Sequence, residues 1–226
     1  MPNLKNEIEL WKKGYTVIGV DEVGRGAFAG PLYVGGVIFN PKSNIKYLET
    51  LGINDSKKLK PNVRKLLSKV IQKESLAIYI SKIEVPIINR IGIGKATFMA
   101  MRDVVKNLRE KSNLSHATGY TSKPERFFVL ADGFYIKYLK GVGLKNQRGI
   151  IGGDGISLSI AAASVIAKVA RDNHMRKLSA KFKEFGWGRN KGYGTNFHRA
   201  ALTKFGPTRL HRTNFIKSWV LPTRQC

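Results

Sequence analysis

Short apolar runs rich in β-branched residues predict strands along the first 131 residues of the chain. Each run is bounded by glycine, proline or polar residues, and each is too short to be a typical helix. The predicted strands are Tyr15–Val20, Pro31–Phe39, Leu76–Ile83 and Phe127–Ala131. The first two are close enough in sequence to form a hairpin across a glycine-rich turn.

Apolar residues at helical spacing predict helices between and after these strands. The predicted helices cover residues 61–73, 91–108, 157–182 and 207–219, and the chain between Gly186 and Gly194 is glycine-rich and basic. Hairpin strands followed by alternating strands and helices predict an α/β layered fold with a mixed sheet. We expect one domain over residues 1–226, with a core at about 14–185 and a basic loop and helical C-terminal extension at about 186–226.

Charge points to a polyanionic partner. The 226 residues include 40 Lys and Arg against 15 Asp and Glu, a net charge of +25. Such a charge attracts nucleic acid, but it suits a catalytically silent nucleic-acid-binding or ribosome-associated protein as well as an enzyme. The single cysteine, Cys226, excludes an intrachain disulfide and a cysteine zinc site. No signal peptide or membrane-length apolar run is present, so we expect a cytoplasmic location and no membrane contact.

Four acids stand out against this basic background. Asp21 and Glu22 follow the first predicted strand, Asp132 follows the fourth, and Asp154 precedes the long apolar helix. Strand ends are where α/β proteins place their sites, so the four carboxylates are expected to meet. Two divalent cations would balance their charge, and oxygen ligands favour Mg²⁺ or Mn²⁺ over zinc. Paired ions of this kind catalyse phosphodiester hydrolysis.

Each piece also has an ordinary structural interpretation. An Asp-Glu pair near a strand end is commonly a solvated turn, Asp132-Gly133 is a common turn dipeptide, and Asp154 suits a helix N-cap. Neighbouring strand residues point to opposite faces, so Asp21 and Glu22 share a site only if the strand ends or twists there.

Several blocks, taken together in this order, resemble ribonuclease HII. They are IGVDEVGRGAFAGP, INDSKKL, VLADG, GGDGISLSIAAASVIAKVARD, NKGYGT and GPTRLHRTNF. The resemblance implies a ribonuclease H-like fold with a central mixed five-stranded sheet flanked by helices. It implies that the four acids are the catalytic metal ligands, that Gly24, Arg25 and Gly26 read a ribose 2′-hydroxyl, that Tyr193 stacks on the adjoining deoxyribose, and that Lys57 contacts a phosphate.

The resemblance also implies an endonuclease that cleaves the RNA strand of RNA/DNA hybrids and the 5′ side of ribonucleotides in duplex DNA, leaving 3′-hydroxyl and 5′-phosphate ends. We expect a monomer, and the sequence leaves open whether the tail contacts a sliding clamp. Three departures stand out. Ala27 replaces a usual proline, Gly152 replaces a usual lysine, and the segment GFYIKYLKG after Asp132 is atypical.

Overall fold

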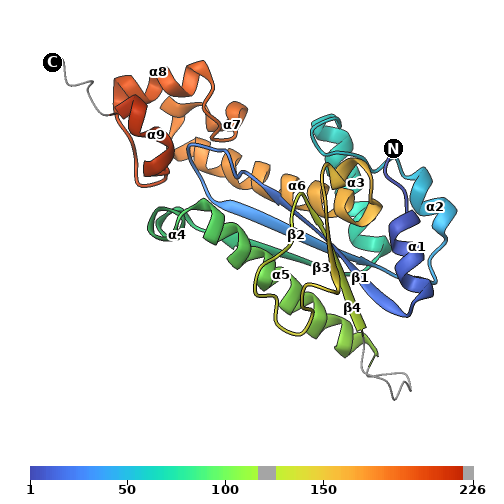
Figure 1. Ribbon diagram of the computed structural model, residues 1–226. Helices are drawn as coiled ribbons and strands as arrows, with labels where there is room; N and C mark the ends of the chain where they lie inside the picture. The colour runs from blue at the N-terminus through green and yellow to red at the C-terminus, as the bar shows by residue number, and fades with distance from the viewer. Residues whose placement is uncertain (117–125, 221–226) are drawn as a thin grey trace.

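A five-stranded mixed sheet forms the centre of the computed structural model, which describes residues 1–116 and 126–220 (Figure 1). The strands are β1 Tyr15–Val23, β2 Leu32–Phe39, β3 Ser75–Ile83, β4 Arg126–Asp132 and β5 Gln147–Ile150, in the spatial order β3-β2-β1-β4-β5. β1, β2 and β3 pair antiparallel, whereas β1, β4 and β5 pair parallel. The mixed sheet is confirmed, although β5 was not predicted because its four residues, QRGI, contain a single apolar side chain.

The first strand is longer than its apolar run. β1 continues to Val23, and its antiparallel register with β2 pairs Asp21 with Gly35 and Glu22 with Val34. The prediction that the acidic pair follows the strand was therefore wrong. Backbone hydrogen bonds with β2 do not depend on side-chain polarity, so the strand extends past the residue where the apolar pattern ends.

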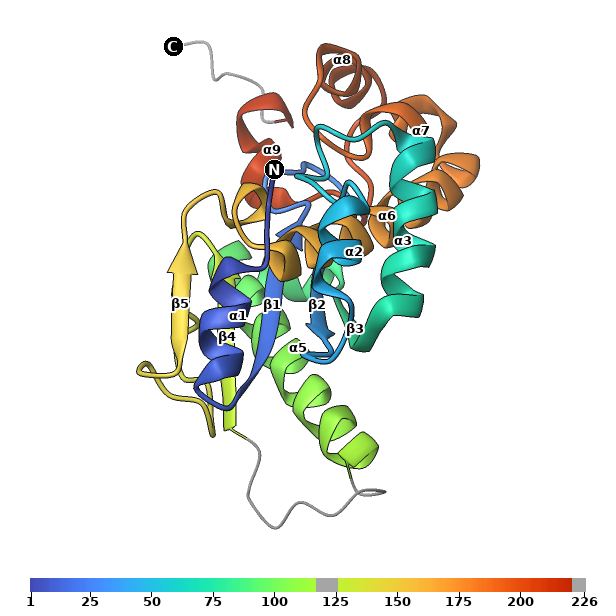
Figure 2. The same ribbon diagram turned by 90° about the vertical axis from the view of Figure 1, so that its right-hand side faces the viewer.

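Helices cover both faces of this sheet, as Figures 1 and 2 show together. They are α1 Lys5–Lys12, α2 Ile45–Thr50, α3 Pro61–Glu74, α4 Val85–Ile91, α5 Ile93–His116, α6 Leu158–Lys181, α7 Trp187–Asn190, α8 Asn196–Phe205 and α9 Thr213–Val220, with 3₁₀ turns η1 Gly153–Gly155 and η2 Lys183–Phe185. α5 packs on one face, and α6 packs on the other with α1 and α3 beside it. The predicted helices at α3, α5, α6 and α9 are present with shifted bounds.

Glycines let α6 approach the sheet closely. A Cβ atom at Gly35 would meet the backbone carbonyl of Ala163, and one at Gly19 would meet the backbone of Ser159. On the opposite face, a Cβ atom at Gly36 would meet side chains of α5. The small residues in the first half of α6 therefore lie directly against β1 and β2, as the sequence predicted for a helix pressed on a sheet.

The C-terminal helices α7, α8 and α9 gather at one end of the molecule, around the end of α6 (Figure 1). They share a small core that includes Met175 from α6 and the buried side chains of Trp187, Leu202 and Ile216. The helical extension is thus present, and part of the expected basic loop is helical. Among the described residues, no helix is both long enough and apolar enough to cross a membrane.

Candidate functional site

The sheet brings the acids of β1 and β4 to the same edge. Parallel pairing of these strands runs up to Val20 opposite Ala131, so Asp21 and Asp132 are the next residues on adjacent strands. Asp21 is buried, and Glu22 exposes 14% of its side chain. The backbone N–H of Glu22 donates to Asp21 Oδ1 at 2.7 Å. Residues 111 positions apart in the sequence therefore become neighbours through strand register.

Asp154 reaches this edge through a tight turn after β5. Its 3₁₀ turn, η1, is fixed to β4 because Gly153 N–H donates to Asp132 Oδ1 at 2.7 Å. A Cβ atom on Gly153 would lie 2.7 Å from the Cδ1 methyl of Ile160, so a larger residue here would require that side chain to move. The helix-capping interpretation of Asp154 is wrong, because the N-cap of α6 is Ser157, whose hydroxyl accepts from Ile160 N–H.

Burial and mutual repulsion perturb these carboxyls. Burial, followed by the charge of Glu22, raises the pKa of Asp21 well above its usual value. Burial also raises the pKa of Glu22 to about 7, with a further contribution from Asp132. The pKa of Asp154 is raised first by burial and then by Asp55 and Asp132. A cluster that resists ionisation in this way favours a bound cation.

The donor set fits a hard divalent cation, although the side chains do not already converge. All four acids offer carboxylate oxygens, which hard divalent cations prefer as ligands. Glu22 Oε2 is buried without a hydrogen-bond partner. Within residues 1–116 and 126–220, no three acidic, histidine or cysteine side chains are grouped closely enough to share one ion as they stand. The ligand role of Asp21, Glu22, Asp132 and Asp154 therefore stays a prediction.

The loop that carries Lys57 adds a fifth carboxylate, Asp55, which the sequence interpretation missed. Lys57 N–H donates to Asp55 Oδ1 at 2.9 Å. Partial burial lowers the pKa of Lys57, but the charges of Asp154, Asp55 and other acids outweigh it and raise that pKa overall. Its ammonium group therefore lies in the field of the acidic cluster, and no observation assigns it to a phosphate. The only sequence signal for Asp55 is its place in the NDSKK block.

The glycine–arginine–glycine turn lies beside the acids. Gly24 has φ +92° and leaves no room for a Cβ atom, whereas a Cβ atom at Gly26 would meet nothing within 4 Å. Arg25 exposes 48% of its side chain, lies 3.8 Å from Glu22 and is 5.2 Å from the ring centroid of Phe134. The open space at Gly26 allows a ligand to approach the backbone.

Two of the sequence departures have a structural consequence. Ala27 N–H donates to the carbonyl of Gly24 at 3.3 Å, a bond that the usual proline cannot make, so Ala27 closes the turn. Gly152 adopts φ +63°, a left-handed conformation that suits glycine. A cation is nevertheless present near Asp154, because the charge of Lys57 acts to lower the pKa of that carboxyl.

A buried arginine from the C-terminal extension holds this turn. The guanidinium of Arg212 donates to the carbonyls of Gly24 at 2.7 Å, Arg25 at 2.9 Å and Gly30 at 2.8 and 3.0 Å. Arg212 is completely buried, and burial lowers its pKa to about 9. Because one planar fork binds three carbonyls, it fixes the backbone of the turn. Sequence reasoning missed this residue, although it lies in the HRTNF block.

A second buried arginine links the turn to the loop of Tyr193. Arg171 donates to the carbonyls of Ala29, Pro31 and Lys191 at 2.9 to 3.2 Å. Its guanidinium carbon lies 5.4 Å from the ring centroid of Tyr193. The amide of Ala29 also donates to the neighbouring carbonyl of residue 192 at 3.1 Å. The structure therefore places the half-buried Tyr193 next to the segment that follows the turn.

Two buried histidines, His198 and His211, lie next to the loop of Tyr193 and are hydrogen-bonded to it or to each other. Trp187 Nε1–H donates to His198 Nε2 at 3.1 Å, so the proton of His198 is on Nδ1, which donates to the carbonyl of Tyr193 at 3.0 Å. His211 Nδ1 accepts from Thr208 N–H at 2.9 Å, and its Nε2 donates to His198 Nε2 at 3.0 Å. Burial lowers both pKa values, that of His211 to about 4. Both rings are therefore neutral, buried and hydrogen-bonded.

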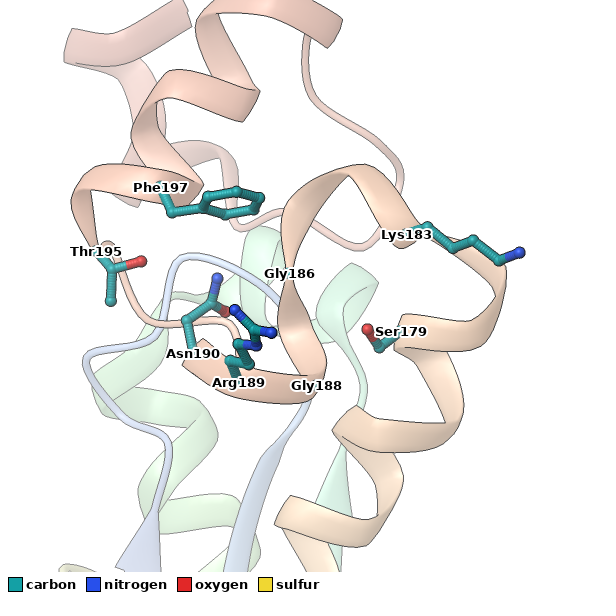
Figure 3. A pocket seen from close by; sticks show the side chains of 8 residues that line it. All are labelled: Ser179, Lys183, Gly186, Gly188, Arg189, Asn190, Thr195 and Phe197. Atoms are coloured by element: carbon teal, nitrogen blue, oxygen red, sulfur yellow. The ribbon is translucent and has the colours of Figure 1, made fainter.

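A cleft of about 680 Å³ lies between the end of α6 and the helices α7 and α8 (Figure 3). Arg189 and Asn190 project from α7 below the ring of Phe197, while Lys183 extends away from them. The cleft contains no acidic side chain among its lining residues. Its charged lining residues are Lys183 and Arg189, and none of the four acids lines it.

Known proteins resemble this chain over most of its length. The family model of Ribonuclease HII matches residues 18–218. The chain is 39% identical over 213 residues to a Ribonuclease HII of Caldicellulosiruptor bescii, which covers 94% of this chain and 92% of that protein.

Two solved structures share the fold. One is the PCNA:RNase HII complex from Archaeoglobus fulgidus, with a TM-score of 0.70, 22% identity, and coverage of 92% of this chain and 98% of that one. The other is Bst-RNase HIII in complex with Mn²⁺, with a TM-score of 0.70, 19% identity, and coverage of 91% and 69%. At these identities the likeness supports the ribonuclease H-like fold alone. Taken with the family match, it leads to one conclusion: this chain belongs to the ribonuclease HII family, the endoribonucleases of ribonuclease H type 2.

Proposed function

We propose that this endoribonuclease is metal-dependent and that it hydrolyses the phosphodiester on the 5′ side of a ribonucleotide, in duplex DNA or in the RNA strand of a hybrid. The products would be a 3′-hydroxyl and a 5′-phosphate. The observation that carries the proposal is a buried carboxylate cluster with raised pKa values, set beside a glycine–arginine–glycine turn on a strongly basic chain. Acids at the centre and cations around them suit a nuclease.

Asp21, Glu22, Asp132 and Asp154 would hold two divalent ions, Mg²⁺ or Mn²⁺. All-oxygen donors, raised pKa values and the unpartnered Glu22 Oε2 support this assignment. The manganese complex of Bst-RNase HIII, a protein of the same fold, supports the same ion chemistry. When bound, such ions supply an activated water and stabilise the charge on the reacting phosphate oxygens.

The turn at Gly24, Arg25 and Gly26 would recognise the ribose. Backbone groups in the open space at Gly26 are accessible to a 2′-hydroxyl, which is both donor and acceptor and is absent from DNA. Arg212 holds the backbone of this turn through the carbonyls of Gly24 and Arg25. The ring of Tyr193, held beside the same segment through Arg171, would stack on the adjoining sugar and so select an RNA-to-DNA step.

The net charge of +25 would supply affinity for the phosphate backbone. Binding should therefore weaken steeply as salt rises. The Archaeoglobus fulgidus structure is a complex with PCNA, which supports a clamp contact as an extension of this proposal. The sequence leaves open whether the tail makes this contact, and residues 221–226 lie outside the described residues.

The test is the variant Asp21→Asn on a duplex that contains one ribonucleotide, with Mg²⁺ and Mn²⁺ in turn. We expect cleavage to fall by at least about a thousandfold, because the variant loses a ligand charge at the reacting centre. Duplex binding should be retained or strengthened, because a negative charge facing the phosphates is gone. Glu110→Gln, which removes one exposed carboxylate from α5, is the control and should cleave normally.

The same assay with EDTA separates the alternatives. Loss of cleavage with binding retained supports metal-dependent hydrolysis. Full cleavage by Asp21→Asn, or cleavage that persists in EDTA, contradicts the proposal. Cleavage of a hybrid but not of the single-ribonucleotide duplex would contradict the proposed selection of an RNA-to-DNA step.

A further inference from the structure

The segment that connects β4 to β5 has an unusual division between buried and exposed residues. We call residues 133–144 the tyrosine loop; it lies over α5 (Figure 1). Ile136, Leu139 and Val142, spaced three apart, are buried in the core that α5 shares with the sheet. The tyrosines between them face outward, Tyr135 with 52% and Tyr138 with 87% of its surface exposed. The loop therefore has its own anchors and an apolar outer surface.

Hydrogen bonds fix the backbone of this loop. The buried side chain of Gln147 accepts from Ile136 N–H at 2.7 Å and donates to the carbonyls of Ile136 and Gly143 at 3.2 and 3.0 Å. Arg102 and Arg109 of α5 donate to the carbonyls of residues 137 and 140 at 3.0 and 2.9 Å. Because the backbone is tied at several points, the positions from which the outward side chains project are fixed.

The backbone conformation at Tyr138 and the exposed rings of this loop do not favour folding. Tyr138 has φ +56°, a left-handed conformation that disfavours residues other than glycine, asparagine and aspartate. Its ring and that of Tyr135 border an open cavity of about 950 Å³, which Phe98 and Leu144 also line. Local strain and exposed aromatic surface that persist in a well-anchored loop indicate a binding role.

Charge decides which class of partner fits. Residues 133–153 contain four cations and no acid, and Lys137 and Lys140 alternate with the two exposed tyrosines. A polyanion complements this surface, whereas an ordinary apolar peptide gains nothing from the lysines. Tyrosine rings flanked by cations are the elements with which proteins bind unpaired nucleic acid, because unpaired bases expose faces for stacking.

The loop is continuous with the candidate active site. It begins directly after Asp132, and the ring of Phe134 contacts both Arg25 of the turn, at 5.2 Å, and Phe98, at 5.4 Å between centroids. A nucleic acid that contacts Arg25 therefore has the tyrosine loop as the adjoining surface.

We propose that the tyrosine loop is an accessory binding site for a single-stranded extension next to the duplex. Tyr135 and Tyr138 stack on unpaired bases, and Lys137 and Lys140 neutralise the phosphates between them. This inference rests on the proposed function, since it extends the path of the same substrate.

The test compares a blunt ribonucleotide-containing duplex with the same duplex bearing a single-stranded extension of about ten nucleotides, a typical single-strand site size. Affinities are measured by fluorescence anisotropy in EDTA, so that cleavage does not interfere. The key variant combines Tyr135→Ser with Tyr138→Asn, because asparagine suits the left-handed backbone at 138. Tyr47→Ala, which removes an exposed tyrosine from α2, is the matched control.

We expect the extension to increase wild-type affinity by roughly tenfold or more, as stacking of one or two bases would. In the double tyrosine variant the ratio of extended to blunt affinity should fall to the part that Lys137 and Lys140 contribute, whereas Tyr47→Ala should keep the wild-type ratio. A second variant, Lys137→Ser with Lys140→Ser, should lower the salt slope for the extended substrate by about 1.4, from two single-strand phosphates at about 0.7 each.

A wild-type ratio near one, or an unchanged ratio and salt slope in both variants, overturns the inference and leaves the surface to a protein partner. Cleavage of the blunt duplex by the wild-type protein with Mn²⁺ is measured in parallel. If that cleavage occurs while the extension adds no affinity, the accessory site alone is wrong. If cleavage is absent, the proposed function itself fails.

Discussion

Replacing Glu22 by glutamine should stabilise the metal-free protein at alkaline pH. Burial raises the pKa of Glu22 from 4.5 to about 7. Between these two values the folded protein binds more protons than the unfolded chain, so its stability falls as pH rises through this window. Above pH 7 the folded state carries the full cost of an ionised buried carboxylate.

At about 1.4 kcal/mol for each pKa unit, the raised pKa of Glu22 lowers the free energy of unfolding by about 3 kcal/mol at pH 8. At pH 5 the same effect is less than about 1 kcal/mol. Glu22→Gln removes this pH-dependent cost. For a chain of this size, 3 kcal/mol corresponds to a rise in Tm of roughly 6–12 °C. The 3.8 Å ion pair with Arg25 forms only when Glu22 is ionised, and its contribution is already contained in the pKa of about 7, because the charge of Arg25 acts to lower that pKa.

The assay is thermal unfolding in EDTA at pH 5 and pH 8, for the wild type, Glu22→Gln and the exposed control Glu110→Gln. We expect the Tm difference between Glu22→Gln and the wild type to be more positive at pH 8 than at pH 5. Addition of Mg²⁺ or Mn²⁺ should then raise the Tm of the wild type more than that of Glu22→Gln. An equal Tm difference at both pH values would refute the idea that the cost of ionising a buried Glu22, to which the charge of Asp132 adds, prepares this site for cations.

Two further predictions concern the supports of the turn and of the Tyr193 loop. The pKa of His211 is about 4, below its usual 6.5, so the unfolded chain binds more protons between these values and stability falls as pH falls through this window. Between pH 7 and pH 4.5 the wild type should lose about 2–3 kcal/mol of its free energy of unfolding through this histidine, and His211→Asn should abolish that loss, as measured by urea unfolding. An unchanged pH dependence would contradict the neutral pairing with His198. Arg212→Lys keeps the charge but loses the fork that holds Gly24 and Gly30, so kcat on a single-ribonucleotide duplex should fall at least about tenfold while the Mn²⁺-induced rise in Tm is retained. Normal kcat, or loss of the Mn²⁺ effect, would show that Arg212 does not act by positioning the turn.

Some of the site was accessible from the sequence because it follows local patterns. Asp132 ends an apolar run, and a run of this kind identifies its own strand. The resemblance then supplied roles for Asp21 and Tyr193 that spacing alone does not give. The end of β1 was misjudged, because its polar residues are held by pairing with β2 and a pattern of apolar residues contains no information on that pairing.

Other parts of the site depend on long-range contacts and had no local signal. Asp55 approaches Asp154 only after the loop before α3 folds onto the sheet edge. Arg212 reaches the carbonyls of Gly24 and Arg25 from nearly 190 positions away. A basic residue in a basic tail looks like surface charge in the sequence, and its complete burial is visible only in three dimensions.

The sequence by itself determined the class of fold, the apolar strands, the excess of positive charge and the family, because these depend on composition and on order along the chain. Only the tertiary structure decided that Asp21 and Asp132 are neighbours, that the buried Arg212 holds the glycine–arginine–glycine turn, and that Tyr135 and Tyr138 face solvent from a fixed loop. Strand register and the burial of polar groups set these features. Both arise when segments distant in sequence pack together and lose contact with water.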